Sequence, residues 1–167
     1  YVEHNAAAIT LNASLIAGST GAPASYDSGI RFKNVNVPAG ATITSAYVTF
    51  TAAGNDAGAP CDTIFYGELS VTPAAYTTYA NFVGRVLTVA NVGWVVPAFV
   101  AGTAYNSPSL ITIINEIIAL PAWAAGNDLA IQWQDNASAN DRQAYDWDNL
   151  SGYPILHITY TTDNIVG

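Results

Sequence analysis

Apolar and polar residues alternate along several short segments of the chain, which is the pattern of β-strands. The clearest segment spans residues 41–51. There we expect Ile43 and Tyr47 on one face of a strand and Val48 and Phe50 on the other, so both faces are partly apolar. This pattern is typical of a sandwich strand that is covered on each side. Further strands are predicted over residues 9–16, 29–35, 63–70, 86–94, 128–134 and 153–161.

Turn-forming residues separate these segments at the spacing of a multi-stranded sandwich. Residues 38–40, 54–56 and 125–127 combine Gly, Pro, Asn or Asp in the way that tight turns require. No segment of 20–50 residues repeats, which argues against a solenoid or a propeller. A length of 167 residues suits one domain over residues 1–167.

One segment has the period of a helix instead. Ser107 and Pro108 resemble an N-cap followed by a first-turn proline, and Pro121 ends the pattern. The apolar positions between them follow helical spacing: Leu110, Ile113, Ile114 and Ile117. We predict one short helix over about residues 108–120 that docks on the sandwich. The alternative is an exposed helix that binds a partner.

Charge is scarce and mostly negative. Half of the residues are apolar, a tenth are charged, and four cations against twelve carboxylates give a net charge of −8. Much of the surface is therefore neutral or covered. Because nucleic-acid affinity comes mainly from Lys and Arg, nucleic acid is an unfavourable partner, whereas a divalent cation or a positively charged surface suits the chain. No apolar run approaches the roughly 20 residues that span a bilayer, and the start of the sequence lacks the features of a signal peptide, so we expect no membrane insertion.

Residues suited to catalysis are few. Glu68 and Glu116 are the only glutamates inside predicted elements, and nothing in the sequence brings them together as paired carboxylates. No Gly-x-Ser-x-Gly motif is present, and His4 and His157 are the only imidazoles. Cys61 is the only cysteine, so no internal disulfide can form. We predict that the protein is not an enzyme.

A family resemblance covers nearly the whole chain. Its most specific part is Gly29-Ile30-Arg31-Phe32 followed by residues 37–48, Val-Pro-Ala-Gly-Ala-Thr-Ile-Thr-Ser-Ala-Tyr-Val. The chain resembles jelly-roll surface modules of bacterial secreted proteins and phage virion proteins, similar to the DNRLRE domain and to carbohydrate-binding jelly rolls. This resemblance implies an all-β, two-sheet antiparallel jelly-roll sandwich. Residues 12–16 depart from the family, because relatives often carry acidic residues there.

A structural calcium ion is one prediction for the polar loops. Residues 135–141, with Asp148 and Asn149 nearby, supply the oxygen atoms that calcium prefers. The resemblance to calcium-bearing jelly rolls implies that Glu3 and Asp146 share the ion. The alternative is a polar hairpin loop with ordinary turn residues.

Aromatic residues are the other candidate binding groups. Four of them fall in or beside predicted loops, where sugars or proteins can contact them: Trp147, Tyr145, Tyr153 and Tyr105. The remaining tryptophans, Trp94, Trp123 and Trp133, are expected in the core. Three arginines, Arg31, Arg85 and Arg142, are each expected to pair with a carboxylate such as Asp27, Glu68 or Asp146.

These features favour a non-catalytic structural or adhesive module on a virion, as a decoration or appendage protein, or on a cell surface. We expect it on the virion exterior or the extracellular surface, bound to copies of itself or to a viral or cell-surface lattice protein. Residues 1–10 and 161–167 are candidate arms that add strands to a neighbour. The alternative is a calcium-stabilised carbohydrate-binding module whose partner is a glycan.

Overall fold

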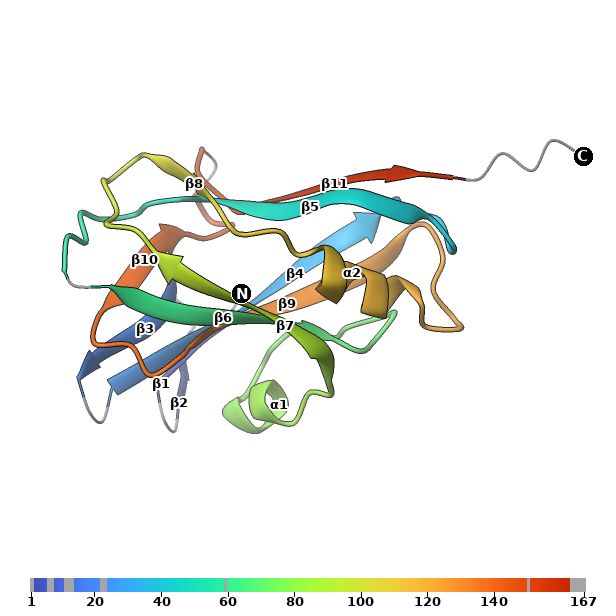
Figure 1. The fold of residues 1–167 in the computed structure, drawn as a ribbon. Helices are drawn as coiled ribbons and strands as arrows, with labels where there is room; N and C mark the ends of the chain where they lie inside the picture. Colours follow the sequence, from blue (N-terminus) through green and yellow to red (C-terminus); the bar gives the residue numbers. More distant parts are fainter. Residues whose placement is uncertain are drawn as a thin grey trace, which may run out of the picture.

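The chain folds into two antiparallel β-sheets stacked face to face (Figure 1), which confirms the prediction of an all-β, two-sheet sandwich. The computed structural model describes residues 2–5, 8–10, 14–21, 24–58, 60–149 and 151–162. The larger sheet has the order β10-β3-β4-β9-β6-β7, with β1 paired to β4 and β2 paired to β1, and the smaller sheet has the order β11-β5-β8. The strands are β1 (Val2–Asn5), β2 (Ala8–Thr10), β3 (Ser14–Gly21), β4 (Ala24–Val35), β5 (Thr42–Thr51), β6 (Cys61–Glu68), β7 (Leu87–Val96), β8 (Ala104–Asn106), β9 (Asn127–Asp135), β10 (Asp141–Tyr145) and β11 (Ile155–Thr161).

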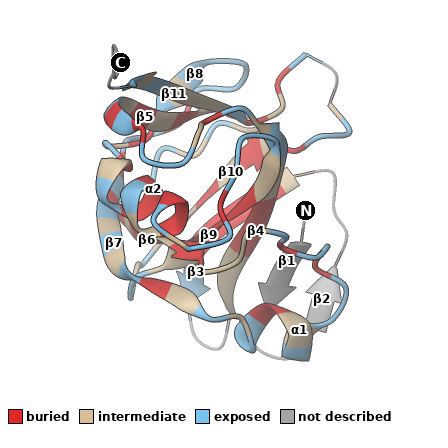
Figure 2. Ribbon diagram, turned by 90° about the vertical axis from the view of Figure 1, so that its right-hand side faces the viewer, coloured by how far each residue is buried: buried red, intermediate tan, exposed pale blue. Residues whose placement is uncertain are grey.

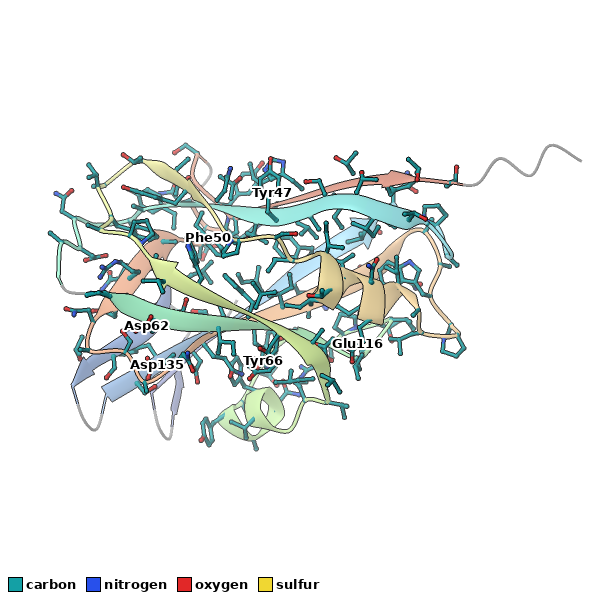
Figure 3. The ribbon with its side chains drawn as sticks, viewed as in Figure 1. Tyr47, Phe50, Asp62, Tyr66, Glu116 and Asp135 are labelled. Carbon is teal, nitrogen blue, oxygen red and sulfur yellow. The ribbon has the colours of Figure 1, made fainter. Side chains whose placement is uncertain are left out.

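Aromatic rings fill the space between the two sheets. Phe50 points from β5 toward the larger sheet (Figure 3), and its ring centroid lies 4.9 Å from that of Trp133 and 5.8 Å from that of Trp94. The Trp133 indole N–H donates to Thr63 Oγ1 at 2.8 Å, so the polar atom of this buried ring is satisfied. The predicted core positions of Trp94, Trp123 and Trp133 are confirmed, since all three are buried.

Strand β5 contains a bulge that changes which face its residues occupy. Between Ile43 and Ser45 the strand has one residue more than its partner β11, because Ile43 lies opposite Tyr160 and Ser45 opposite Thr159. Ile43 therefore points into the core, whereas Tyr47 lies on the outer face. The expectation that Ile43 and Tyr47 share one face was wrong for this reason.

Helix α2 (Ile111–Ile118) fills one side of the sandwich, between β5 of the smaller sheet and β6 and β7 of the larger one (Figure 2). Its apolar side is fully buried through four isoleucines: Ile113, Ile114, Ile117 and Ile118. The predicted docking is confirmed. The N-cap prediction was wrong, because the helix begins after Leu110 and the Ser107 hydroxyl accepts the backbone N–H of Val48 instead.

A second helix, α1 (Tyr79–Val83), lies on the outer face of the larger sheet. We expected a single helix, and this five-residue element is too short to show a helical period. Its Phe82 packs with Tyr76 and Ala130, and the ring of Tyr76 lies where a Cβ atom at Gly29 would come within 2.5 Å. Neither helix of the described chain has the length and apolarity to cross a lipid bilayer.

The strands at the N-terminal edge partly close the opposite side of the sandwich. The predicted strand over residues 9–16 is two strands, β2 and β3. Strand β10, which pairs with β3, reaches the end of β5 through a bridge between Ala144 and Ala52. This contact joins the two sheets at one end of that side only.

Candidate binding groove on the open side of the sandwich

Two strand edges border the open part of this side. Strand β9 pairs with β4 from Ser28 to Val35, so β1, which pairs with Tyr26–Gly29, must lie on the other edge of β4. Beyond Gly29, no strand in the described parts of the chain pairs with that edge. Strand β11 belongs to the smaller sheet and, among the described strands, pairs with β5 alone. Each sheet therefore has a free strand edge here, on β4 beyond Gly29 and on β11.

A groove runs between these two edges. It consists of two adjoining hollows of about 300 and 380 Å³, and both are lined by Phe32, Lys33, Trp147 and Pro154. Residues 30–35 of β4 and the next two residues of the chain, 36 and 37, each line at least one of the two hollows. Because successive side chains of a strand point to opposite faces, lining by consecutive residues means that the strand presents its edge.

Trp147 and Tyr153 form the aromatic part of the groove. The Trp147 side chain is 69% exposed and lines both hollows. Its ring centroid lies 4.8 Å from that of half-buried Tyr153, and the two ring planes are inclined by 50°. The predicted exposure of Trp147 is confirmed. The two rings meet at an angle and do not form one flat platform.

The other two predicted binding aromatics lie elsewhere. Tyr105 on β8 stacks on buried Phe99 at 4.5 Å, and its hydroxyl accepts the backbone N–H of Val100 at 3.0 Å. Tyr145 on β10 is half-buried, and its ring lies where a Cβ atom at Gly152 would come within 2.6 Å. Neither tyrosine lines the groove, so the structure brings together only Trp147 and Tyr153 from the predicted set.

Two of the four cations of the chain, Arg31 and Lys33, also line the groove. The guanidinium of Arg31 donates to the Pro73 carbonyl at 3.2 Å, and the Lys33 side chain is exposed. Nothing in the sequence indicated that these cations share a groove with Trp147, which lies more than a hundred positions away.

Asp146 lies at the floor of the groove. It is 2% exposed, and its Oδ1 accepts the backbone N–H of Asp148 at 3.0 Å. Burial raises the pKa of the Asp146 carboxyl, and the hydrogen bond from Asp148 opposes this effect. Of Glu3, its predicted partner in a calcium site, the structure describes only the β1 backbone, opposite Ser28 and Thr10. Their shared ion stays a prediction.

The polar run at residues 135–141 connects β9 to β10, and it is not the hairpin loop of the alternative reading, because β10 pairs with β3 and not with β9. Asp135 holds this loop, because its Oδ1 accepts the Ser138 backbone N–H at 2.9 Å and its Oδ2 accepts the Ser25 hydroxyl at 3.0 Å. The run ends inside a strand, since β10 begins at Asp141. Within the described residues, no three His, Cys, Asp or Glu side chains gather as a metal site.

The expected ion pairs of the arginines are confirmed in one case. Arg85 donates to Glu68 Oε1 at 2.8 Å, and both side chains are nearly buried. Burial raises the pKa of Glu68, while Arg85 acts in the opposite direction. The hydrogen bonds found for Arg31 and for buried Arg142 go to backbone carbonyls, which for Arg142 belong to Pro97, Asp141 and Gly58.

The remaining ionisable and nucleophilic side chains form contacts within the fold. Glu116 on α2 accepts the backbone N–H groups of Val89 and Ala90 on β7, each at 2.8 Å, and it lies far from Asp62 and Asp135 (Figure 3). His157 stacks on Tyr47 at 4.6 Å. Cys61 is buried, and burial raises the pKa of its thiol to about 11, which makes it unreactive at neutral pH.

The arrangement is therefore that of a binding groove. It offers two unpaired backbone edges, several apolar side chains, one exposed tryptophan, two cations and the buried carboxylate of Asp146. The chain matches no family model and no curated protein.

Proposed function

We propose that the protein is a non-catalytic structural or adhesive module, whose copies bind one another or a lattice protein through this groove. The observation that carries the proposal is the exposed ring of Trp147 beside two unpaired strand edges. Exposed apolar surface next to a groove marks interaction sites. Tryptophan is also enriched among the residues that contribute most to binding.

The chemistry of the groove favours binding over catalysis. Hydrolysis by paired carboxylates needs two acids that face each other across the substrate. Among the described residues that line the groove, Asp146 is the one carboxylate, and its Oδ1 accepts a backbone hydrogen bond. A non-catalytic role fits this arrangement best.

The resemblance to jelly-roll surface modules supports a place on the virion exterior or on a cell surface, for instance as a decoration or appendage protein. The composition agrees with such a place, because only a tenth of the residues are charged. A module packed into a lattice covers neutral surface that a freely diffusing protein would expose.

A calcium-stabilised carbohydrate-binding module is the second candidate, and the Trp147–Tyr153 pair favours it. Sugars stack on exposed aromatic faces, and these two rings lie in a groove. The inclination of 50° leaves one exposed ring for stacking, which is less than an extended glycan uses.

Light scattering after size exclusion tests the proposal. We expect the molar mass to rise above 17.5 kDa with concentration, and Trp147→Ala to remove most of this rise. Val95→Ala is the matched control, because Val95 is also exposed but lies on β7, on the other side of the sandwich. The same series is run with calcium and then with chelator, which tests for a metal in the fold.

A monomer of constant mass over the whole concentration range would contradict the proposal. A monomer whose melting temperature rises on addition of a glycan would support the carbohydrate-binding candidate instead.

A further inference from the structure

The free edge of β4 continues an edge that already accepts a strand. Strand β1 pairs with β4 in the antiparallel direction and ends its ladder where Val2 lies opposite Gly29. From Ile30 to Val35 the same edge has no described partner strand. These six residues extend over at most about 20 Å, because the register with β9 shifts between Phe32 and Val35. A further strand would therefore lie end to end with β1.

Side chains of the core are visible in the groove beside this edge. Five apolar residues that pack against the core are only partly buried, and all of them line the larger hollow: Phe32, Val35, Leu156, Ile158 and Tyr160. They come from both sheets, since β4 and β11 border the groove. A sandwich that lacks one strand exposes its core in this way, and an added strand with apolar side chains would cover it.

The charge of the groove selects the kind of strand. The chain has a net charge of −8 and only four cations, and two of these, Arg31 and Lys33, line the groove. An acidic or neutral strand without Lys or Arg fits such a groove. A second copy of this acidic chain contains segments that meet that condition.

One segment of the chain has a suitable sequence. Residues 162–167, Thr-Asp-Asn-Ile-Val-Gly, come after β11 in the sequence and contain three β-branched residues, one carboxylate and no cation. β-branched residues favour extended strands, and Ile165 and Val166 supply apolar side chains for the exposed core.

We infer that the groove takes residues 162–167 of a second copy as an extended strand, which pairs with the free edge of β4 and covers the exposed core side chains. The inference rests on the proposed function and names the contact through which copies associate.

Cysteine cross-linking tests this contact in the full-length chain. Asn36→Cys places a thiol in the larger hollow, and Ile165→Cys places one in the C-terminal segment. We expect a short bis-maleimide to join a mixture of the two variants into a covalent dimer. The chain with Cys61 alone should not react, because that thiol is buried. Val95→Cys mixed with Ile165→Cys is the control on β7, and it should give no dimer.

Two substitutions and one peptide separate the possible outcomes. Ile165→Asp should weaken self-association at least about tenfold, the size of effect that loss of an apolar anchor has at an interface. Val95→Asp, an equivalent change on β7, should leave it unchanged. A synthetic peptide of residues 162–167 should change the Trp147 fluorescence, and Trp147→Phe should remove that signal.

Self-association that persists in the Ile165→Asp variant would overturn the inference and leave the proposed function standing. A monomer under all conditions, with no response to the peptide, would overturn both. A cross-link inside one chain of the Asn36→Cys, Ile165→Cys double variant would show that the segment binds its own groove, against the inference. A fluorescence response to oligogalacturonate but not to the peptide would show an acidic glycan as the ligand, also against it.

Discussion

The two sides of the sandwich between the sheets are completed in different ways. On one side, α2 buries four isoleucines between β5, β6 and β7, and its Glu116 accepts two backbone N–H groups of β7. On the other side, β4 beyond Gly29 and β11 each have one edge without a described partner strand, and side chains that pack against the core line the groove. An unpaired strand edge is a site for unwanted pairing, which proteins usually block. In the function that we propose, the open side is the one that takes a partner.

The largest expected effect on stability comes from truncating a buried isoleucine of α2, on the closed side of the sandwich. Ile114→Ala removes a fully buried side chain and should lower the free energy of unfolding by about 2–5 kcal/mol, because it leaves a cavity. Ile158→Ala, at the half-buried edge of the open side, should cost about half as much. Urea unfolding of both variants measures the contrast. Equal losses would mean that the two sides are packed alike.

Removing the Glu116 carboxylate, which accepts two backbone N–H groups of β7, should have a smaller effect on stability. Glu116→Ala deprives two backbone N–H groups of a charged acceptor and should lower the free energy of unfolding by about 1–2 kcal/mol. Amide exchange should become faster at Val89 and Ala90. Glu116→Gln keeps one acceptor oxygen, so its free energy of unfolding should lie between those of the natural protein and Glu116→Ala. Unchanged exchange at both amides would show that Glu116 does not protect this edge.

The buried acid of the groove should make stability depend on pH. Because burial raises the pKa of Asp146, the folded protein holds this proton more tightly than the unfolded chain does. The contribution of protonated Asp146 to the free energy of unfolding is fully present below the pKa of an ordinary Asp. It is lost as the pH rises through the raised pKa of the folded protein. Asp146→Asn should therefore melt slightly higher than the natural protein at pH 7, with no difference at pH 3.

Thermal melts from pH 3 to 7 in the presence of a chelator measure this difference. If the natural protein melted higher than Asp146→Asn at pH 7 only when calcium is added, the carboxylate would be a calcium ligand, as the sequence predicted.

Trp147→Ala should have the smallest effect on stability, below about 0.5 kcal/mol, because most of its side chain is already in water. Its effect should appear in association instead. The free energy of unfolding is measured by urea denaturation at low protein concentration, where association does not contribute. A loss of several kcal/mol would show that Trp147 supports the fold and not a partner.

Local patterns in the sequence predicted the elements that depend on them. Strand β5, helix α2 and the buried tryptophans follow from alternation, from helical spacing and from the apolar context of each ring. Strand β10 was missed because Asp and Asn dominate the preceding turn, although Arg142 and Ala144 of this strand are buried. Its burial depends on pairing with β3, which lies far away in the sequence.

The groove could be predicted only in part. The composition around Trp147 indicated an exposed ring, but the hollow beside it arises between the free edges of β4 and β11, which belong to two different sheets. Lys33 and Tyr153 meet there across more than a hundred residues. Edge positions follow from strand order, and single-sequence patterns do not encode strand order.

Hydrogen exchange as a function of protein concentration tests most directly whether copies associate through the open side. The account predicts that amides of residues 30–35 on β4 and of β11 become more protected as the concentration rises, while those of β7 from Asn91 to Val96 do not change. Protection that increases on β7 and not beside the groove would contradict it.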